Sequence, residues 1–258
     1  MKPPLDFSFD CLVSLATWKI LGKAGTSIAQ YRVTPTENFR LRRFSMDACM
    51  VYENVIECVY DQFVPPLQPG SRVLDVGAHI GSFSIHLARR FPKLHILSFE
   101  PHPITYQLLT ENISLNGLQV AIQTFQVGIG GNDGTSRLYI DNGNTGGNST
   151  VMPIHANPNH VPIHLTSLPT VFAKNAIKQC ALLKLDCEGA EYDILTRAPD
   201  GLLRKITTII METHPGYSVS SLVRRLKKAG FRVRIVANGF THPLLKHIFT
   251  APLCFATR

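Results

Sequence analysis

Three carboxylates stand within six residues in the segment LKLDCEGAE, which runs from Leu183 to Glu191. Its apolar start predicts a buried strand that ends at Asp186, with a helix from about Glu191. Glu188 and Glu191 are three residues apart, so they share a face if the helix begins between them. Their repulsion requires a cation, hydrogen bonds or a helix N-terminus to offset it. The segment therefore indicates acid–base chemistry, or else only a charged helix start.

A second acidic site follows the next predicted strand, in the segment METHP. Glu212 ends this strand and His214 follows on the same rim. A histidine beside a carboxylate is a natural general base near neutral pH, although a surface histidine would fit the same pattern. Asp186 and Glu212 could also hold Mg²⁺ through their oxygens, but nothing in the sequence requires a metal.

A glycine turn stands upstream, in VLDVGAHIGSFS from Val73 to Ser84. Asp75 lies in the strand before the turn, and Glu100 ends the following strand, as in α/β sheets that hold a nucleoside. A dinucleotide site has the spacing G-x-G-x-x-G, whereas here Gly77 and Gly81 flank His79. The turn is therefore expected to hold a nucleoside without a diphosphate, of which S-adenosylmethionine is the commonest. Glu100 would accept hydrogen bonds from ribose hydroxyls, and Asp75 would brace the turn through backbone N–H groups or merely cap it.

Strands and helices alternate through most of the chain. The expected strands are 72–76, 95–99, 120–127, 136–140, 181–185, 206–211, 231–237 and 247–256. The expected helices are 50–63, 80–90, 103–115, 191–196 and 218–229. This order predicts a mostly parallel α/β sheet with helices on both faces. The last two strands lack a helix between them, so one of them should be antiparallel.

Two segments fall outside this pattern. Residues 1–44 are expected to form an extension that packs on the core or on the substrate side of a main domain at 45–258. Within the extension, 11–21 could be a helix and 39–44 alternates like a strand with one basic face. Residues 141–150 form a polar, glycine-rich loop, for which we favour a lid over a simple linker.

Composition describes a folded protein of 258 residues, with 45% hydrophobic and 17% charged residues. The net charge of +8 fits an anionic partner or mere solubility. The six cysteines form no C-x-x-C pair, which disfavours zinc and indicates reduced thiols in the cytoplasm. No apolar run approaches the roughly 20 residues that span a bilayer, and weak membrane attachment through 11–21 is the less favoured alternative to a packed helix.

Three of these segments together resemble the FkbM family of S-adenosylmethionine-dependent methyltransferases. They are Val73–Ala88, the run SFEP from Ser98 to Pro101, and the more specific LKLDCEGAE. The resemblance covers roughly 45–256, including Tyr52-Glu53, and implies a Rossmann-like class I methyltransferase sheet. One departure is Pro169, which stands where the family commonly has an acid.

The resemblance implies methyl transfer to a hydroxyl, often on a sugar or a polyketide-like molecule. The expected cofactor contacts are Glu53, Asp75, Gly77, Ala78, His79, Gly81, Ser82, Glu100, Pro101 and Gly128. The expected catalytic residues are Asp186, Glu188, Glu191 and His214. We expect His214 or Asp186 to be the base, with the two glutamates orienting the acceptor or a cation.

Two other functions remain open at this stage. A nucleic-acid methyltransferase would use the basic clusters at 40–43 and 224–228, and its binding would weaken steeply with salt. A non-catalytic nucleoside-binding module is disfavoured by the intact glycine turn and its acids. The acceptor, the oligomeric state and the role of 1–44 cannot be read from the residues.

Overall fold

The computed structural model describes residues 7–8, 11, 13, 25, 27–141, 144–151, 159–214, 218–236 and 252–258. Most of the expected helix at 11–21, and the first half of the expected strand at 247–256, lie outside these residues. Within the described residues, no helix has the length and apolar character needed to cross a bilayer.

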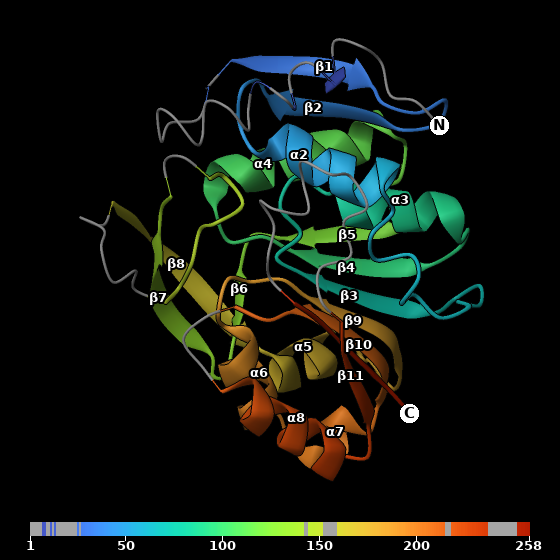
Figure 1. Cartoon of the computed structure of the whole chain (residues 1–258), viewed down its shortest axis with the longest axis vertical. Helices are drawn as coiled ribbons and strands as arrows, with labels where there is room; N and C mark the ends of the chain where they lie inside the picture. The colour runs from blue at the N-terminus through green and yellow to red at the C-terminus, as the bar shows by residue number, and fades with distance from the viewer. Residues whose placement is uncertain are drawn as a thin grey trace.

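A seven-stranded sheet runs through the centre of the molecule (Figure 1). From one edge to the other its strands are β11 (Arg232–Val236), β12 (Leu253–Thr257), β10 (Ile206–Glu212), β9 (Cys180–Leu185), β3 (Arg72–Val76), β4 (His95–Phe99) and β5 (Ile122–Phe125). The pairs from β10 to β5 are parallel, and β12 is antiparallel to both of its neighbours. The predicted parallel sheet with an antiparallel C-terminal strand is confirmed.

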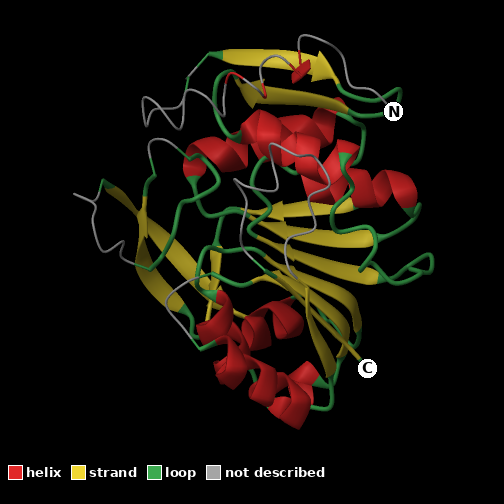
Figure 2. Ribbon diagram, in the orientation of Figure 1, coloured by secondary structure: helices red, strands yellow, loops and turns green. Residues whose placement is uncertain are grey.

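Helices cover both faces of this sheet (Figure 2). One face carries α2 (Asp47–Val51), the π-helical turn η1 (Tyr52–Ile56), α3 (Ser82–Arg90) and α4 (Pro103–Leu115). The other carries α5 (Leu168–Lys174), α6 (Glu191–Arg197), α7 (Asp200–Leu203) and α8 (Val219–Lys228). Successive strand residues point to opposite faces, so Val73 joins the core of the first face and Leu74 that of the second. The central strands thus contribute side chains to two hydrophobic cores, one on each face of the sheet, and their sequences are therefore continuously apolar.

The hairpin of β1 (Ile28–Arg32) and β2 (Asn38–Arg42) lies against α4. Asn112 donates to the carbonyl of Arg40 over 3.0 Å, and Asn116 donates to that of Asn38 over 2.7 Å. Described residues of the extension, such as Phe39, share one hydrophobic cluster with α3. The expected strand is confirmed at 39–42, whereas 43–44 form a turn. Its arginines Arg40 and Arg42 are held in ion pairs within the fold.

A small sheet beside the main one was not predicted. It consists of β6 (Gly128–Gly130), β8 (His160–Ser167) and β7 (Gly134–Tyr139), and only β7 was expected, as 136–140. β6 has only three residues and β8 contains Pro162, so neither shows a clear local strand pattern. Their pairing joins segments that are distant in the chain.

The expected helix at 50–63 is also shorter than predicted. Regular helix gives way to a π-turn at Tyr52–Ile56, after which Cys58 has a φ of 51°. A left-handed residue stops a helix, and the chain continues to Phe63 as turns. This break places Glu53 in the pocket and Tyr60 beside it.

Candidate active site

A pocket opens at the carboxyl ends of β3, β4, β9 and β10, where the chain order along the sheet reverses. It contains about 930 Å³ of empty space, part of it open to solvent. Its lining residues are Met50, Glu53, Val76, Gly77, His79, Phe99, Glu100, Pro101, Gly128, Ile129, Leu138, Asn144, Thr145, Gly146, Asn148, Thr150, Asp186, Cys187, Glu188, Ala190 and Glu212. Parallel α/β sheets bind ligands at this switch point.

Glu100 holds two backbone amides with its two carboxylate oxygens. One oxygen accepts from His79 N at 3.0 Å and the other from His102 N at 2.9 Å. The residue is only 7% exposed, and burial raises the pKa of its carboxyl group. Each oxygen keeps lone pairs for a ligand, so the carboxylate can accept further hydrogen bonds from a diol in the pocket.

The glycine turn approaches the acidic segment more closely than any side chain would allow. A Cβ atom on Gly77 would lie 1.8 Å from the carbonyl oxygen of Asp186, and Gly77 has a φ of 75°. Gly81 has a φ of 92° and begins α3. Both glycines are therefore required by the backbone, Gly77 lining the pocket and Gly81 shaping the turn behind it.

Asp75 occupies a different place from the one expected. It is fully buried, accepts a hydrogen bond from the Ser84 hydroxyl at 2.6 Å, and lies 3.5 Å from Nζ of Lys184. The described contacts include no amide of the glycine turn, so the expected bracing through backbone N–H groups is replaced by a contact with a buried ammonium. Asp75 acts beneath the pocket, not in its lining.

Lys184 joins the glycine turn to the acidic segment. Its ammonium donates to the carbonyl of Gly77 at 3.1 Å and to Asp186 at 3.2 Å. Although burial opposes the charge, the carboxylates of Asp186 and Asp75 raise the pKa of Lys184. In turn, the ammonium of Lys184 lowers the pKa of Asp186 despite the burial of that carboxyl group. A lysine in an otherwise apolar strand must be paired when buried, and this was the signal that could have identified it from the sequence.

Glu212 and Glu53 add two further carboxylates to the pocket. Tyr60 donates to Glu212 over 2.7 Å. Burial, followed by the charge of Asp186, raises the pKa of Glu212 to about 8. Burial and the charge of Glu212 raise the pKa of Glu53 as well. These two groups therefore differ from Asp186, which Lys184 keeps ionised.

His214 lies among three glutamates. Its Nδ1 is 3.1 Å from Glu191, and its Nε2 is 3.3 Å from Glu188 and 3.7 Å from Glu212. Although burial opposes the charge, the hydrogen bond to Glu191 and the neighbouring carboxylates raise the pKa of His214 to about 10. An imidazolium already carries its proton, so His214 is a poor general base at neutral pH, contrary to one of our expectations.

Glu188 is the carboxylate that this arrangement leaves best suited to proton transfer. Burial raises its pKa to about 7, against the opposing charge of His214. Its φ is 54°, a strained conformation for a glutamate that is typical of functional sites. The helix α6 begins at Glu191, as expected, so Glu188 lies in the turn before it and does not share a helical face with Glu191.

A network over the pocket mouth was not foreseen. The buried carboxylate of Asp47 accepts two hydrogen bonds from the Arg42 guanidinium at 2.8 Å each, and lies 3.3 Å from Nε2 of His79. Thr145, in the polar loop, donates to the same carboxylate over 2.8 Å. These charges hold the pKa of Asp47 well below its usual range.

The predicted residues thus divide into two groups. Those that line the pocket are Glu53, Gly77, His79, Glu100, Pro101, Gly128, Asp186, Glu188 and Glu212. Those that support it from behind are Asp75, Ala78, Gly81, Ser82, Glu191 and His214. The sequence did not assign Lys184, Tyr60, Asp47 and Thr145 to the site. Tyr60 and Thr145 contact partners that are 152 and 98 residues away in the chain.

Comparison with known proteins shows related sequences. Residues 75–233, more than half of the chain, match the family model described as the methyltransferase FkbM domain. The methyltransferase sdnD of Sordaria araneosa is 27% identical over 65% of this chain and 75% of its own length. The 31-O-demethyl-FK506 methyltransferase FkbM of Streptomyces tacrolimicus is 25% identical over 65% of this chain and 75% of its own length. The METTL16 methyltransferase domain shares the fold, with a TM-score of 0.52, 12% identity, and coverage of 97% of this chain and 78% of that one.

Proposed function

Because the chain belongs to the FkbM methyltransferase domain family, we propose that it methylates a hydroxyl group of a sugar, a glycan or a small-molecule natural product. It is an S-adenosylmethionine-dependent methyltransferase. The observation that carries the proposal is the pairing, in one pocket, of Glu100 beside the glycine turn with the carboxylates of Asp186, Glu188 and Glu212.

The residues present fit the cofactor. The close approach of Gly77 to Asp186 leaves a backbone cradle that a Cβ would fill, and Glu100 presents lone pairs suited to ribose hydroxyls. When bound, S-adenosylmethionine supplies an activated methyl group on a positively charged sulfur. An acidic pocket favours that charge.

Glu188 is our candidate for the general base. It lines the pocket, and its pKa of about 7 lies close to working pH, where a base is most effective. His214, with its pKa of about 10, would hold Glu188 by charge, and Asp186 would orient the acceptor. Glu191, fully buried, would keep the turn in place.

The charge of the acidic cluster is offset by groups of the protein itself. Ligand atoms of Asp186, Glu212 and His214 lie within 4.8 Å of one another. However, Lys184 already contacts Asp186, and the protonated His214 faces Glu212. We therefore propose that the reaction needs no Mg²⁺.

The polar loop supports an enclosed, small acceptor. Thr145 donates to Asp47, and Ser149 donates to the carbonyl of Glu188 over 2.5 Å. The described part of the loop thus connects the two sides of the pocket, as a lid would. The name of the Streptomyces relative, which places its methyl group on an oxygen of FK506, supports a hydroxyl acceptor.

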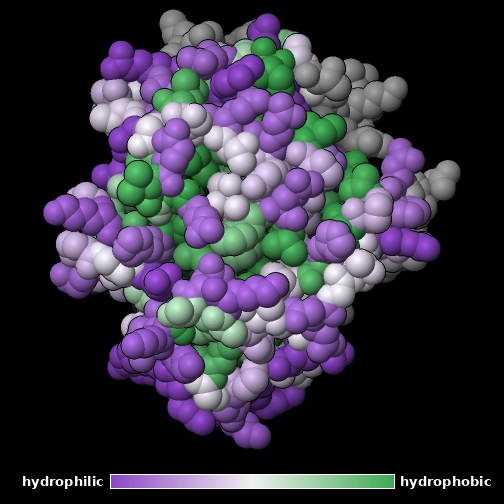
Figure 3. All heavy atoms as spheres, turned by 180° about the vertical axis from the view of Figure 1, so that it is seen from behind, coloured by the Kyte–Doolittle hydropathy of each residue, from purple (hydrophilic) through white to green (hydrophobic). Residues whose placement is uncertain are grey.

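The same geometry weakens the nucleic-acid alternative. Arg42 is bound to Asp47, Arg40 lies 2.9 Å from Glu111, and Arg225 lies 2.6 Å from Asp200. Three of the seven basic residues in the two clusters are therefore paired with acids within the fold. Hydrophilic residues line the lower end of the molecule in Figure 3, which is the end where Figure 1 shows α7 and α8. This end is ordinary solvated surface and is distinct from the pocket.

We further propose a cytoplasmic setting. All six cysteines are free thiols, and Cys11 and Cys49 remain unbridged with their sulfur atoms 3.4 Å apart. Such a pair persists as thiols in a reducing compartment.

A methyl-transfer assay tests the proposed function. The purified protein is incubated with S-adenosylmethionine and with separate pools of glycans, hydroxylated metabolites and RNA, and products are detected by mass. We expect a gain of one methyl group in one of the first two pools, and its loss with Glu188→Gln but not with the surface control Glu111→Gln. Modification of RNA alone would contradict the proposal.

A further inference from the structure

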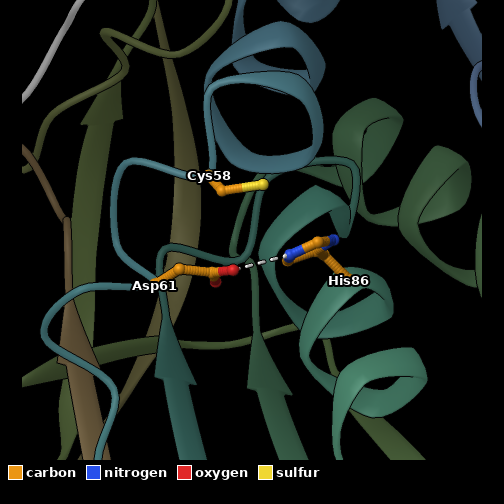
Figure 4. A group of neighbouring side chains, drawn as sticks. All are labelled: Cys58, Asp61 and His86. Atoms are coloured by element: carbon orange, nitrogen blue, oxygen red, sulfur yellow. Dashed lines mark hydrogen bonds and ion pairs between the residues drawn. The ribbon is translucent and has the colours of Figure 1, made fainter. Parts of the chain in front are cut away.

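A second cluster of chemically reactive side chains lies on the outer side of α3, apart from the pocket lining. Cys58 and Asp61 come from the turns that follow η1, and His86 comes from α3 (Figure 4). One potential ligand atom from each residue lies within 4.8 Å of the other two. All three side chains are partly buried, so the cluster is sheltered but still reachable from solvent.

One distance within the cluster matches a tetrahedral metal site. His86 Nε2 and an Asp61 oxygen are 3.3 Å apart. Two ligands about 2.0–2.1 Å from Zn²⁺ at a tetrahedral angle are separated by roughly 3.3–3.4 Å. The nitrogen and oxygen therefore already stand at the separation that the ion requires.

The outer contacts of the cluster also fit a metal. Glu37, only 4% exposed, lies 3.0 Å from Nδ1 of His86 through one carboxylate oxygen, and its other oxygen accepts from Thr34 at 2.7 Å. Metal-binding histidines commonly give their second ring N–H to such a carboxylate. Arg90 lies 2.8 Å from Oδ2 of Asp61, the same oxygen that faces His86, so the guanidinium and the ion would share this oxygen.

The thiol of Cys58 is the ligand that determines which metal the cluster would bind. Its backbone has a φ of 51°, and this directs the thiol toward the carbonyl of Val55 at 3.4 Å and into the cluster. A soft sulfur together with an imidazole and a carboxylate suits Zn²⁺ and not Mg²⁺.

We propose that Cys58, Asp61 and His86 bind Zn²⁺, with solvent in the remaining coordination position. The sequence does not indicate this site through a C-x-x-C pair, because the residue three positions after Cys58 is the aspartate Asp61. The ion would fix the segment that carries Glu53 and Tyr60 to the pocket, since Tyr60 directly precedes Asp61. The proposal itself depends on the cluster and not on the methyl acceptor.

Metal titration under reducing conditions tests the site. Chelator-treated full-length protein is titrated with Co²⁺, whose visible spectrum reports thiolate ligation, and Zn²⁺ is then added in competition. We expect one Co²⁺ per chain, a thiolate-to-metal absorption band, and displacement by Zn²⁺. Cys58→Ser, Asp61→Asn and His86→Gln should each weaken binding at least tenfold, and Glu37→Gln about tenfold.

Two controls separate this cluster from other parts of the molecule. His95→Gln removes an exposed histidine at the start of β4, and Glu212→Gln removes a carboxylate of the pocket. Both should bind Co²⁺ like the unchanged protein. Binding without the thiolate band, binding that survives Cys58→Ser, or binding lost with Glu212→Gln would each overturn the proposal, as would no binding at all.

Discussion

His214 Nδ1 lies 3.1 Å from Oε1 of Glu191. The same glutamate accepts backbone hydrogen bonds from Cys187 at 2.8 Å and Gly189 at 2.9 Å. A single buried carboxylate therefore connects the end of β10 to the turn that presents Glu188. Glu191 is a positioning residue, which keeps His214 charged and the turn closed.

The charge of His214 has a measurable consequence for stability. Its pKa is raised from 6.5 to about 10, so its stabilising contribution is complete below pH 6.5 and is lost as pH rises through about 10. His214→Gln should lower the free energy of unfolding by about 1–3 kcal/mol at pH 6, and the difference from the unchanged protein should shrink toward pH 10. Denaturant unfolding at several pH values measures this, and NMR titration of the imidazole that gave a pKa near 6.5 would contradict it.

Glu188→Gln tests the proposed base. We expect kcat to fall by about 10²–10⁴-fold, with the affinity for S-adenosylmethionine largely retained. In the unchanged enzyme the rate should rise with pH through about 7, as the carboxyl group ionises. Kinetics across pH 5.5–9, with calorimetry for the cofactor, measure both effects. A rate that is independent of pH across this range, together with a fully active variant, would assign the proton to another group.

Glu100→Gln tests the cofactor half of the pocket. The amide keeps one acceptor oxygen but loses the charge and the second acceptor, so a hydrogen bond to a ribose hydroxyl should weaken. Hydrogen bonds to charged groups contribute about 1.5–3 kcal/mol, which corresponds to roughly a 10–100-fold higher Kd. Calorimetry with S-adenosylmethionine checks this, with Glu111→Gln as the control, and an unchanged Kd would place the nucleoside elsewhere.

Gly77→Ala and Gly117→Ala form a matched pair. Both glycines have a left-handed φ, but a Cβ on Gly117 would meet nothing within 4 Å, whereas one on Gly77 would meet the Asp186 carbonyl. Gly117→Ala should cost about 1–2 kcal/mol of stability from backbone strain alone, and Gly77→Ala should cost clearly more and weaken cofactor binding. Thermal unfolding and calorimetry test the pair, and equal effects would mean that the close approach of β3 and β9 is unimportant.

The proposed independence from Mg²⁺ rests on the contact of Lys184 with Asp186 and Asp75. After chelation, adding Mg²⁺ should leave the methyl-transfer rate unchanged. Lys184→Met should destabilise the protein by about 3–5 kcal/mol, because the fully buried Asp75 and the partly buried Asp186 lose their cation. A rate restored by Mg²⁺ but not by Zn²⁺ would show that the acids bind a metal instead. Restoration by Zn²⁺ alone would indicate the cluster at His86.

Local patterns determined much of the fold. The expected bounds of the strand at 95–99 and of the helix at 103–115 agree with β4 and α4. Pro103 begins that helix, and Gly117, with a φ of 65°, follows its end. Apolar runs, proline and glycine act through neighbouring residues, so the sequence alone is sufficient for them.

The pocket acids Glu100, Asp186 and Glu212 could also be identified directly, because each stands at the end of a strand whose carboxyl end faces the same crevice. The protonation states of these acids could not be determined from the sequence. Whether His214 is a base or a fixed cation depends on Glu188 and Glu191, and the ionised state of Asp186 depends on Lys184. Only the tertiary structure brings these groups within 4 Å of one another, and a pKa is determined by such distances and by burial, which the order of residues does not contain.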